Sequence, residues 1–330
     1  MMKNIFFLAV ALVMFSACSS KSKFVPEKIT SKIDYSSNLQ SELVEVSREG
    51  ATYANGMVVS NKRGLLKHRL EKGYHFVSDD GKAILVADAN AHVKVLQDGK
   101  IRFEKEFDFA LSSGSIKENL LALVFSNNTL MLYDMVQDKE LYREDLEPTY
   151  ANDSRLANPL FLNDLVIFPT LDGRLLMMDS IQKVILRDVA ISDKALFNNV
   201  IFLEEEDNIL VAATGSKVIS INAETIETKR VDVKDVLYGD KNVYIFTKTG
   251  KILKCDSSLN VLKEVKFPFA IFSAVMNTDG IYVVEKSGYL IAMDKNLENS
   301  KTYALPSEIN KPLFTFGNRL FFGKRFIKLH

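Results

Sequence analysis

The sequence predicts an all-β domain built from repeated four-stranded units. One phrase recurs six times at intervals of 34 to 44 residues, and a shorter copy ends the chain. Each copy has a β-branched strand, a tight polar turn, a second apolar strand ending near Asp or Asn, and a more polar third strand. Two copies are AILVADANAHVKVLQDGKIRFEKEF from Ala83 and DLVIFPTLDGRLLMMDSIQKVILRDV from Asp164. Self-similarity at such a period indicates a repeat architecture.

The turns and strand lengths inside each copy are typical of hairpins. Turn pairs such as Asp172-Gly173 and Ser287-Gly288 lie between strands of four to seven residues. A weaker segment before each copy, such as residues 157–161, supplies an innermost strand, while the outermost strand is charged, as in residues 183–188. No window sustains the helical period of about 3.6 residues. Four strands per unit of about 40 residues predict the blades of a β-propeller.

The predicted number of blades is seven, or eight if residues 41–70 contribute most of another blade. The last copy, RLFFGKRFIKLH from Arg319, lacks an outer strand. We expect an N-terminal strand to complete this blade and close the ring. Candidate strands lie between Ser41 and Leu70, including residues 42–46 and the hairpin 51–60.

The first residues have the pattern of a bacterial export signal. Lys3 precedes an apolar run over residues 5–15, and small residues follow at Ser16 and Ala17. The site resembles a lipobox, which implies that residues 1–17 are a lipoprotein signal peptide and that Cys18 is lipidated. The alternative is an ordinary signal cut after Ala17, which would leave Cys18 as an unpaired thiol.

The chain after the signal divides into a tether and a domain. Residues 18–40 are polar and rich in Ser and Lys, which predicts a flexible tether, and residues 41–330 form the propeller. Ser19 resembles the residue that directs lipoproteins to the outer membrane. The expected location is therefore the outer membrane, with a lipid anchor and the domain facing the periplasm.

Charge and cysteine content exclude some classes of function. Lys plus Arg and Asp plus Glu both number 42, so no net charge attracts nucleic acid. Cys255 is the other cysteine of the chain, which predicts a core that depends on apolar burial without an internal disulfide. Cys255 itself is expected in a buried strand.

One recurring position resembles a known family. When the innermost strand is counted, the strand that ends near Asp or Asn is the third strand of its blade. This residue occurs in five predicted blades, at Asp134, Asp179, Asn222, Asp256 and Asp294. This resembles the quinoprotein-like (PQQ-like) repeat, although the chain has no Trp to brace adjacent blades. Lipobox, tether and propeller in this order resemble outer-membrane assembly lipoproteins of the BamB type. That resemblance implies a non-catalytic scaffold that binds the central subunit of the β-barrel assembly machinery.

The sequence offers no pattern for catalysis. The four histidines, His68, His75, His92 and His330, are scattered, and no zinc, phosphate-loop or nucleophile-elbow motif occurs. The acidic run over residues 204–207 is interpreted as a solvated loop. We therefore expect no enzyme activity, no cofactor and no metal. The alternatives are an exported propeller enzyme or cofactor-binding protein, or an envelope lipoprotein with an unrelated partner.

Candidate partner contacts are apolar, aromatic and Arg side chains between blades, because such groups anchor protein interfaces. Two strings qualify, and either could instead be an inner strand. They are Phe107, Phe109 and Leu111, and Tyr150, Arg155 and Leu156. The expected protein is monomeric outside its complex.

Overall fold

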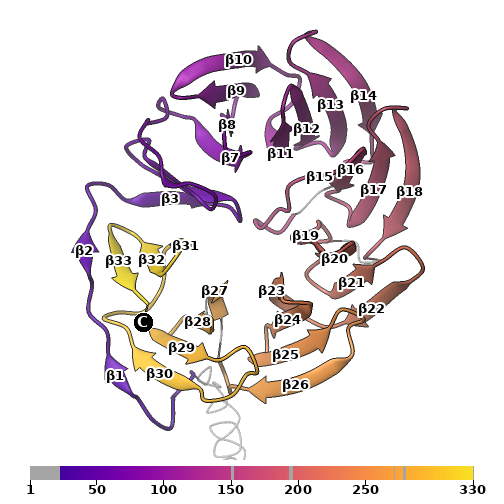
Figure 1. Cartoon of the computed structure of the whole chain (residues 1–330). Helices are drawn as coiled ribbons and strands as arrows, with labels where there is room; N and C mark the ends of the chain where they lie inside the picture. Colours follow the sequence, from indigo (N-terminus) through magenta and orange to yellow (C-terminus); the bar gives the residue numbers. More distant parts are fainter. Residues whose placement is uncertain (1–22, 150–151, 193–195, 271, 278–279, 330) are drawn as a thin grey trace, which may run out of the picture.

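The chain forms a ring of eight blades around a central channel (Figure 1). The computed structural model describes residues 23–149, 152–192, 196–270, 272–277 and 280–329. Each blade is a sheet, and its consecutive strands follow one another from the channel to the outer rim. The all-β propeller prediction is confirmed, while seven blades is wrong and eight is correct.

Four strands make each of blades 1 to 4, paired with antiparallel neighbours. They are β3 (Leu43–Val46), β4 (Gly50–Tyr53), β5 (Val58–Ser60) and β6 (Gly64–Leu65) in blade 1; β7 (His75–Asp79), β8 (Ala83–Ala87), β9 (His92–Gln97) and β10 (Lys100–Glu106) in blade 2; β11 (Leu111–Lys117), β12 (Leu120–Phe125), β13 (Thr129–Asp134) and β14 (Lys139–Asp145) in blade 3; and β15 (Leu160–Leu162), β16 (Leu165–Pro169), β17 (Arg174–Asp179) and β18 (Val184–Ala190) in blade 4.

Blades 5 to 8 continue the same order. They contain β19 (Phe202–Glu206), β20 (Ile209–Ala213), β21 (Lys217–Ile221) and β22 (Ile226–Arg230) in blade 5; β23 (Val233–Gly239), β24 (Asn242–Thr247), β25 (Lys251–Asp256) and β26 (Val261–Lys266) in blade 6; β27 (Phe272–Asn277), β28 (Ile281–Glu285), β29 (Tyr289–Met293) and β30 (Lys301–Ala304) in blade 7; and β31 (Leu313–Phe316), β32 (Arg319–Phe322) and β33 (Arg325–Lys328) in blade 8.

Blade 1 accounts for the difference between the seven blades predicted and the eight observed. Its strands are only two to four residues long, so residues 41–70 do not show the repeated phrase of the other blades. Gly50 lets this blade pack closely, because a Cβ there would lie 2.4 Å from the Phe76 ring of blade 2.

The ring is closed by the N-terminal end of the described chain. The short strand β2 (Ser37–Asn38) pairs antiparallel with β33 and becomes the outer strand of blade 8. Just before it, β1 (Ser31–Lys32) adds a parallel fifth strand to blade 7 beside β30. Closure by an N-terminal strand is confirmed, but this strand precedes the range 41–70 in which we expected it. Residues 31–38 of the predicted tether thus pair with the propeller.

Apolar side chains between neighbouring blades form the core. All five residues of β8 are buried, because the second strand of a blade has a neighbouring blade on each side. The chain lacks Trp, and large rings of other types fill these spaces. Fully buried examples are Tyr53, Tyr133, Tyr244, Phe168 and Phe246.

The recurring Asp or Asn orders the turn after the third strand. Asp179 Oδ1 accepts hydrogen bonds from the N–H groups of Ile181 at 2.7 Å and Gln182 at 2.8 Å. Asn222 Oδ1 accepts the same pair of hydrogen bonds within its own turn in blade 5, from the N–H groups of Glu224 and Thr225, both at 2.8 Å. A side-chain oxygen that binds backbone N–H groups two and three residues later stabilises a tight turn. The repeat position is therefore a turn cap.

Within the residues that the structure describes, no helix has the length and apolar character needed to cross a membrane.

Candidate functional site

The channel and the space beside it form two adjoining cavities. One, of about 560 Å³, is lined by innermost strands of several blades, including His75, Leu237 and Phe314. The other, of about 780 Å³, lies beside the turns that follow the innermost strands of blades 1 to 3. Four residues line both: Arg48, Asn61, Asn158 and Glu204. The boundary between the cavities is therefore polar.

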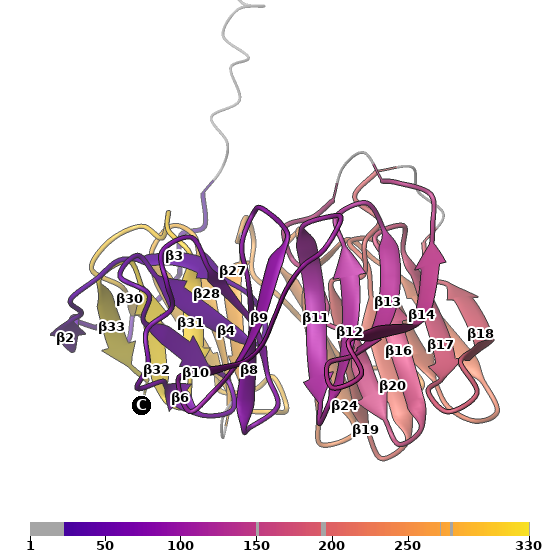
Figure 2. The same cartoon turned by 90° about the horizontal axis from the view of Figure 1, so that it is seen from above.

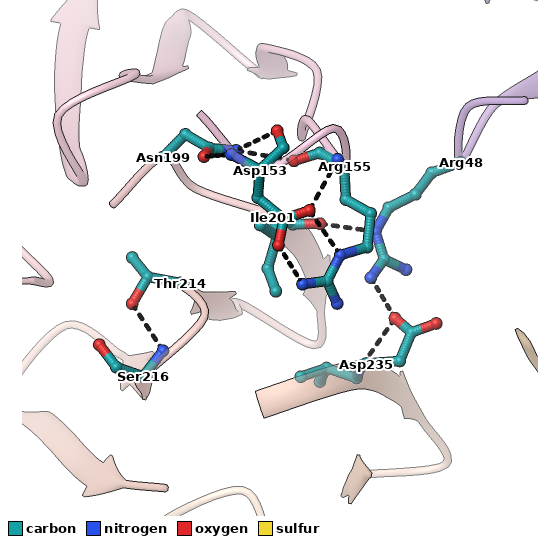
Figure 3. A network of polar contacts seen from close by, with 9 residues as sticks. Arg48, Asp153, Arg155, Asn199, Ile201, Thr214, Ser216 and Asp235 are labelled. Carbon is teal, nitrogen blue, oxygen red and sulfur yellow. Dashed lines mark hydrogen bonds and ion pairs between the residues drawn. The ribbon is translucent and has the colours of Figure 1, made fainter. Parts of the chain in front are cut away.

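Arg48 spans the channel from blade 1 to the opposite side of the ring (Figure 3). It lies in the turn between β3 and β4, and its Nε donates to the carbonyl of Ile201 at 2.7 Å. Its Nη2 forms an ion pair with Asp235 of β23, and the guanidinium lies 4.8 Å from the centre of the Phe202 ring. One side chain thus ties blade 1 to blades 5 and 6.

A second polar group orders the connection between blades 3 and 4. Arg155 Nε donates to Asp153 Oδ1 at 2.8 Å, and Asn199 Nδ2 donates to the Arg155 carbonyl at 2.7 Å. Asn199 Oδ1 accepts from the Asp153 N–H at 2.6 Å. Nη1 of Arg155 is buried and has no hydrogen-bond partner within the described part of the chain. In Figure 3 this group lies beside Ile201, and the Arg48 side chain reaches Ile201 from the right.

Burial changes the acidity of the channel carboxyls. Glu204 opens into both cavities, but the surrounding protein displaces bulk water, and this desolvation raises its pKa to about 7 even though Arg48 favours the ionised form. Desolvation also raises the pKa of Glu49 above its usual value. Burial and the nearby Arg155 lower the pKa of Lys234. The channel therefore holds charges of both signs, with donors and acceptors available to a polar group.

The site has no metal-ligand cluster in its described residues. No group of three or more His, Cys, Asp or Glu side chains is placed to hold an ion in the described part of the chain. Cys255 is fully buried, and burial raises its pKa to about 11. Its predicted place in a buried strand, β25, is confirmed.

The structure separates the residues of the first predicted partner string. Phe107 packs against blade 3, with its ring centre 5.3 Å from that of Phe125 and 5.5 Å from that of Tyr133. Leu111 is buried in the inner strand β11, and Phe109 is 40% exposed. Phe109 is thus the member of this string that is open to a partner.

The second string is also divided. Arg155 belongs to the channel network, and Leu156 is partly buried against the core between blades 3 and 4. Tyr150 lies outside the described residues, as does the predicted lipidation site Cys18.

Sequence reasoning missed the residues that cross the channel. Arg48 and Asp235 are 187 residues apart and belong to no local motif. The acidic run was expected in a solvated loop, but its first three residues lie in strand β19. That interpretation is wrong because the apolar pair Phe202–Leu203 that starts the strand was not recognised as part of the same segment. The apolar residues directly before the run, Phe202 and Leu203, were the signal that could have placed Glu204 on an inner strand.

Solved structures show the same fold. BamB from Moraxella catarrhalis superposes with a TM-score of 0.68 at 12% identity, covering 94% of this chain and 99% of that chain. The C-terminal WD40 domain of Sif2 also gives 0.68 at 12% identity, covering 92% of this chain and 100% of that one. At these identities the likeness concerns the fold alone, and at that level the resemblance to BamB is confirmed. No family model matches the chain.

Curated proteins match over almost the whole chain. The plasminogen-binding protein PgbB from one strain of Helicobacter pylori is 29% identical over 385 residues, covering 99% of this chain and 71% of that protein. PgbB from a second strain is 30% identical over 388 residues with the same coverage. The relation therefore spans every blade of the ring rather than a single repeat, and the chain belongs to the family of the Helicobacter pylori plasminogen-binding protein PgbB.

Proposed function

We propose that this protein is a non-enzymatic, lipid-anchored propeller that docks other proteins at the outer membrane, with plasminogen as its first partner to test. The observation that carries the proposal is the 30% identity with a plasminogen-binding protein over 99% of the chain. Because the match includes all eight blades, this chain and PgbB can share a binding surface on any of them. The lipid anchor rests on the lipobox at Cys18.

The physical character of the ring suits docking. Arg48 connects opposite blades, and β2 completes the last blade. The blades therefore hold the ends of the connecting loops in fixed positions. A surface that is ordered before binding loses less conformational entropy when a partner arrives. Glu140 and Arg143 of β14 line a small recess of about 90 Å³ between blades 2 and 3, which could accept one side chain of a partner.

The test is direct binding of plasminogen to the purified mature lipoprotein. We expect saturable binding to the immobilised protein and none to an unrelated lipoprotein of similar size. Glu140→Ser and Arg143→Ser change charged groups of the recess, and Ile181→Ser changes an exposed residue of another blade as a matched control. Binding no stronger than that of the unrelated lipoprotein would exclude plasminogen as the partner.

The second candidate is a scaffold for outer-membrane β-barrel assembly. Its support is the order of lipobox, polar segment and propeller in the sequence. In-cell crosslinking followed by mass spectrometry would recover the central subunit of the assembly machinery, with a weaker link in Cys18→Ala. Recovery of other envelope proteins without that subunit would exclude this candidate.

The side of the outer membrane on which the propeller lies distinguishes the two candidate functions. A propeller facing the periplasm is inaccessible to protease and to plasminogen added to intact cells. Digestion only after the outer membrane is opened would favour the assembly scaffold. Digestion in intact cells would favour a displayed binding protein.

A further inference from the structure

The described chain begins on one particular face of the disc. The Phe24 ring is 5% exposed and packs edge-on against Phe267 at 6.3 Å and Tyr289 at 5.5 Å. Lys23 forms an ion pair with Glu308 at 3.0 Å. These partners lie at or beside the connections between blades and the turns between second and third strands. We call this side the N-terminal face; in Figure 2 the indigo start of the described chain projects from it.

Three exposed phenylalanines lie in connections on this same face. Phe109, Phe197 and Phe269 are 40%, 57% and 61% exposed. They follow β10, β18 and β26, the last strands of blades 2, 4 and 6. In a ring of eight blades, alternate connections are a quarter turn apart, so the three rings are distributed around the disc rather than gathered at one edge.

The backbone at two of these positions is unfavourable for an aromatic residue. Phe197 has a φ of 55° and Phe269 a φ of 57°. This left-handed region suits Gly and Asn, whereas a bulky side chain there is an outlier. Both side chains are exposed, so packing within the fold does not account for phenylalanine at these positions. Such strain is typical of residues retained for an interaction.

We propose that the N-terminal face rests on a lipid bilayer and that Phe109, Phe197 and Phe269 enter its headgroup region. The proposal rests on the proposed lipid anchor. Phe24 is only six positions after Cys18, so the anchor can lie at most about 22 Å from the fixed Phe24.

A bilayer fits the arrangement of these side chains. A flat surface can contact three points a quarter turn apart at the same time, and Phe side chains bind at the boundary of headgroups and acyl chains. Exposed lysines on turns of the same face, Lys248 of blade 6 and Lys286 of blade 7, belong to the blades beside Phe24 and would attract anionic headgroups.

The absence of Trp from the sequence allows a direct test with single-Trp reporters. The mature lipoprotein would be placed in vesicles of phosphatidylethanolamine and phosphatidylglycerol, with and without brominated acyl chains. Reporters are Phe109→Trp, Phe197→Trp and Phe269→Trp. Matched controls are Val136→Trp and Ile181→Trp, which are 73% and 69% exposed in turns after third strands on the opposite face.

We expect brominated lipid to quench the three reporters at least twofold and to leave the two controls unchanged. Equal quenching at all five positions, or none at the three phenylalanine positions, would overturn the proposal. A response of the three reporters to added plasminogen without any response to lipid would also overturn it, and would assign this face to the protein partner.

A second variant removes the phenylalanines without threatening the fold. Phe197→Asn with Phe269→Asn places at both sites a residue that tolerates positive φ, so stability should be kept or increased. In the Phe109→Trp background this pair should reduce quenching at least twofold, whereas Val136→Asn with Ile181→Asn should not. Unchanged quenching in the first pair would contradict the role of these side chains.

Mass spectrometry of the mature N-terminus distinguishes failure of this proposal from failure of the proposed lipid anchor. An acylated Cys18 without the quenching pattern means that the face proposal fails alone. An unmodified Cys18 with the pattern retained means that the lipid anchor fails while the face still binds lipid.

Discussion

Replacing the side chain that spans the channel should destabilise the whole ring. Arg48→Met keeps the aliphatic stem but removes the hydrogen bond to Ile201, the ion pair with Asp235 and the contact with Phe202. The charged hydrogen bond alone contributes about 1.5–3 kcal/mol. The ring contact adds about 0.5–1 kcal/mol. We expect a loss of about 3 kcal/mol in the free energy of unfolding.

Urea denaturation measures this loss. With a slope of about 3 kcal/mol/M, the midpoint should fall by about 1 M. The matched control is Arg143→Met, which removes ion pairs to Asp145 at 3.1 Å and Asp108 at 3.3 Å on the outer rim. Exposed pairs of this kind are worth at most about 1 kcal/mol.

The double variant with Asp235→Asn tests the mechanism. Groups in direct contact couple by about 0.5–3 kcal/mol, so the two effects should not add. Our reasoning would be refuted if Arg48→Met cost no more than Arg143→Met, or if its effect and that of Asp235→Asn were additive.

Three further perturbations address closure, the turns and pH. Leu39→Pro removes the N–H that donates to the Lys324 carbonyl at 2.6 Å and should lower the thermal midpoint clearly. Leu39→Ala keeps that N–H and should lower the midpoint less. Equal effects of the two variants would show that this backbone hydrogen bond does not stabilise the closed ring. Asp179→Ala should cost about 1 kcal/mol in urea unfolding, and Asp179→Asn should cost much less because Asn222 fills the equivalent position; similar losses would contradict the turn-cap role. The pKa of Glu204 rises from 4.5 to about 7 on folding, so the folded chain holds a proton that the unfolded chain has released, and stability should fall as pH increases between these values. Unfolding free energies from pH 5 to 8 should show a flatter profile in Glu204→Gln, and parallel profiles would rule out this titration.

Local patterns in the sequence determined most of the fold. The repeated Asp or Asn predicts a turn after the third strand, and Asp179 forms that turn through its own side chain. Blade 1 was harder to predict because its outer strand, Gly64–Leu65, has two residues and no alternation to detect. Closure by Ser37–Asn38 was missed in position for the same reason, since a two-residue strand in a polar segment has no hydrophobic pattern.

The channel could not be predicted because its contacts join distant parts of the chain. Arg48 contacts Ile201, which is 153 positions away in the sequence, and nothing near either residue specifies the other. Such a contact depends on the number of blades, which sets where blade 1 lies relative to blade 5. With seven blades the same turn would face a different part of the ring. A correct count was therefore needed before any channel residue could be assigned.

Closure by the N-terminal strand also sets the order in which the chain can mature. Lys328 donates its N–H to Ser36 Oγ, a contact between residues 292 positions apart, and β2 is synthesised long before β33. Early blades can form while synthesis continues, but the ring must stay open until the last strand has been made. Contacts of such separation form slowly because the loop between them must first be closed. During export the unpaired edge of β2 would therefore remain exposed longest, which makes this segment the point where a chaperone would be most useful.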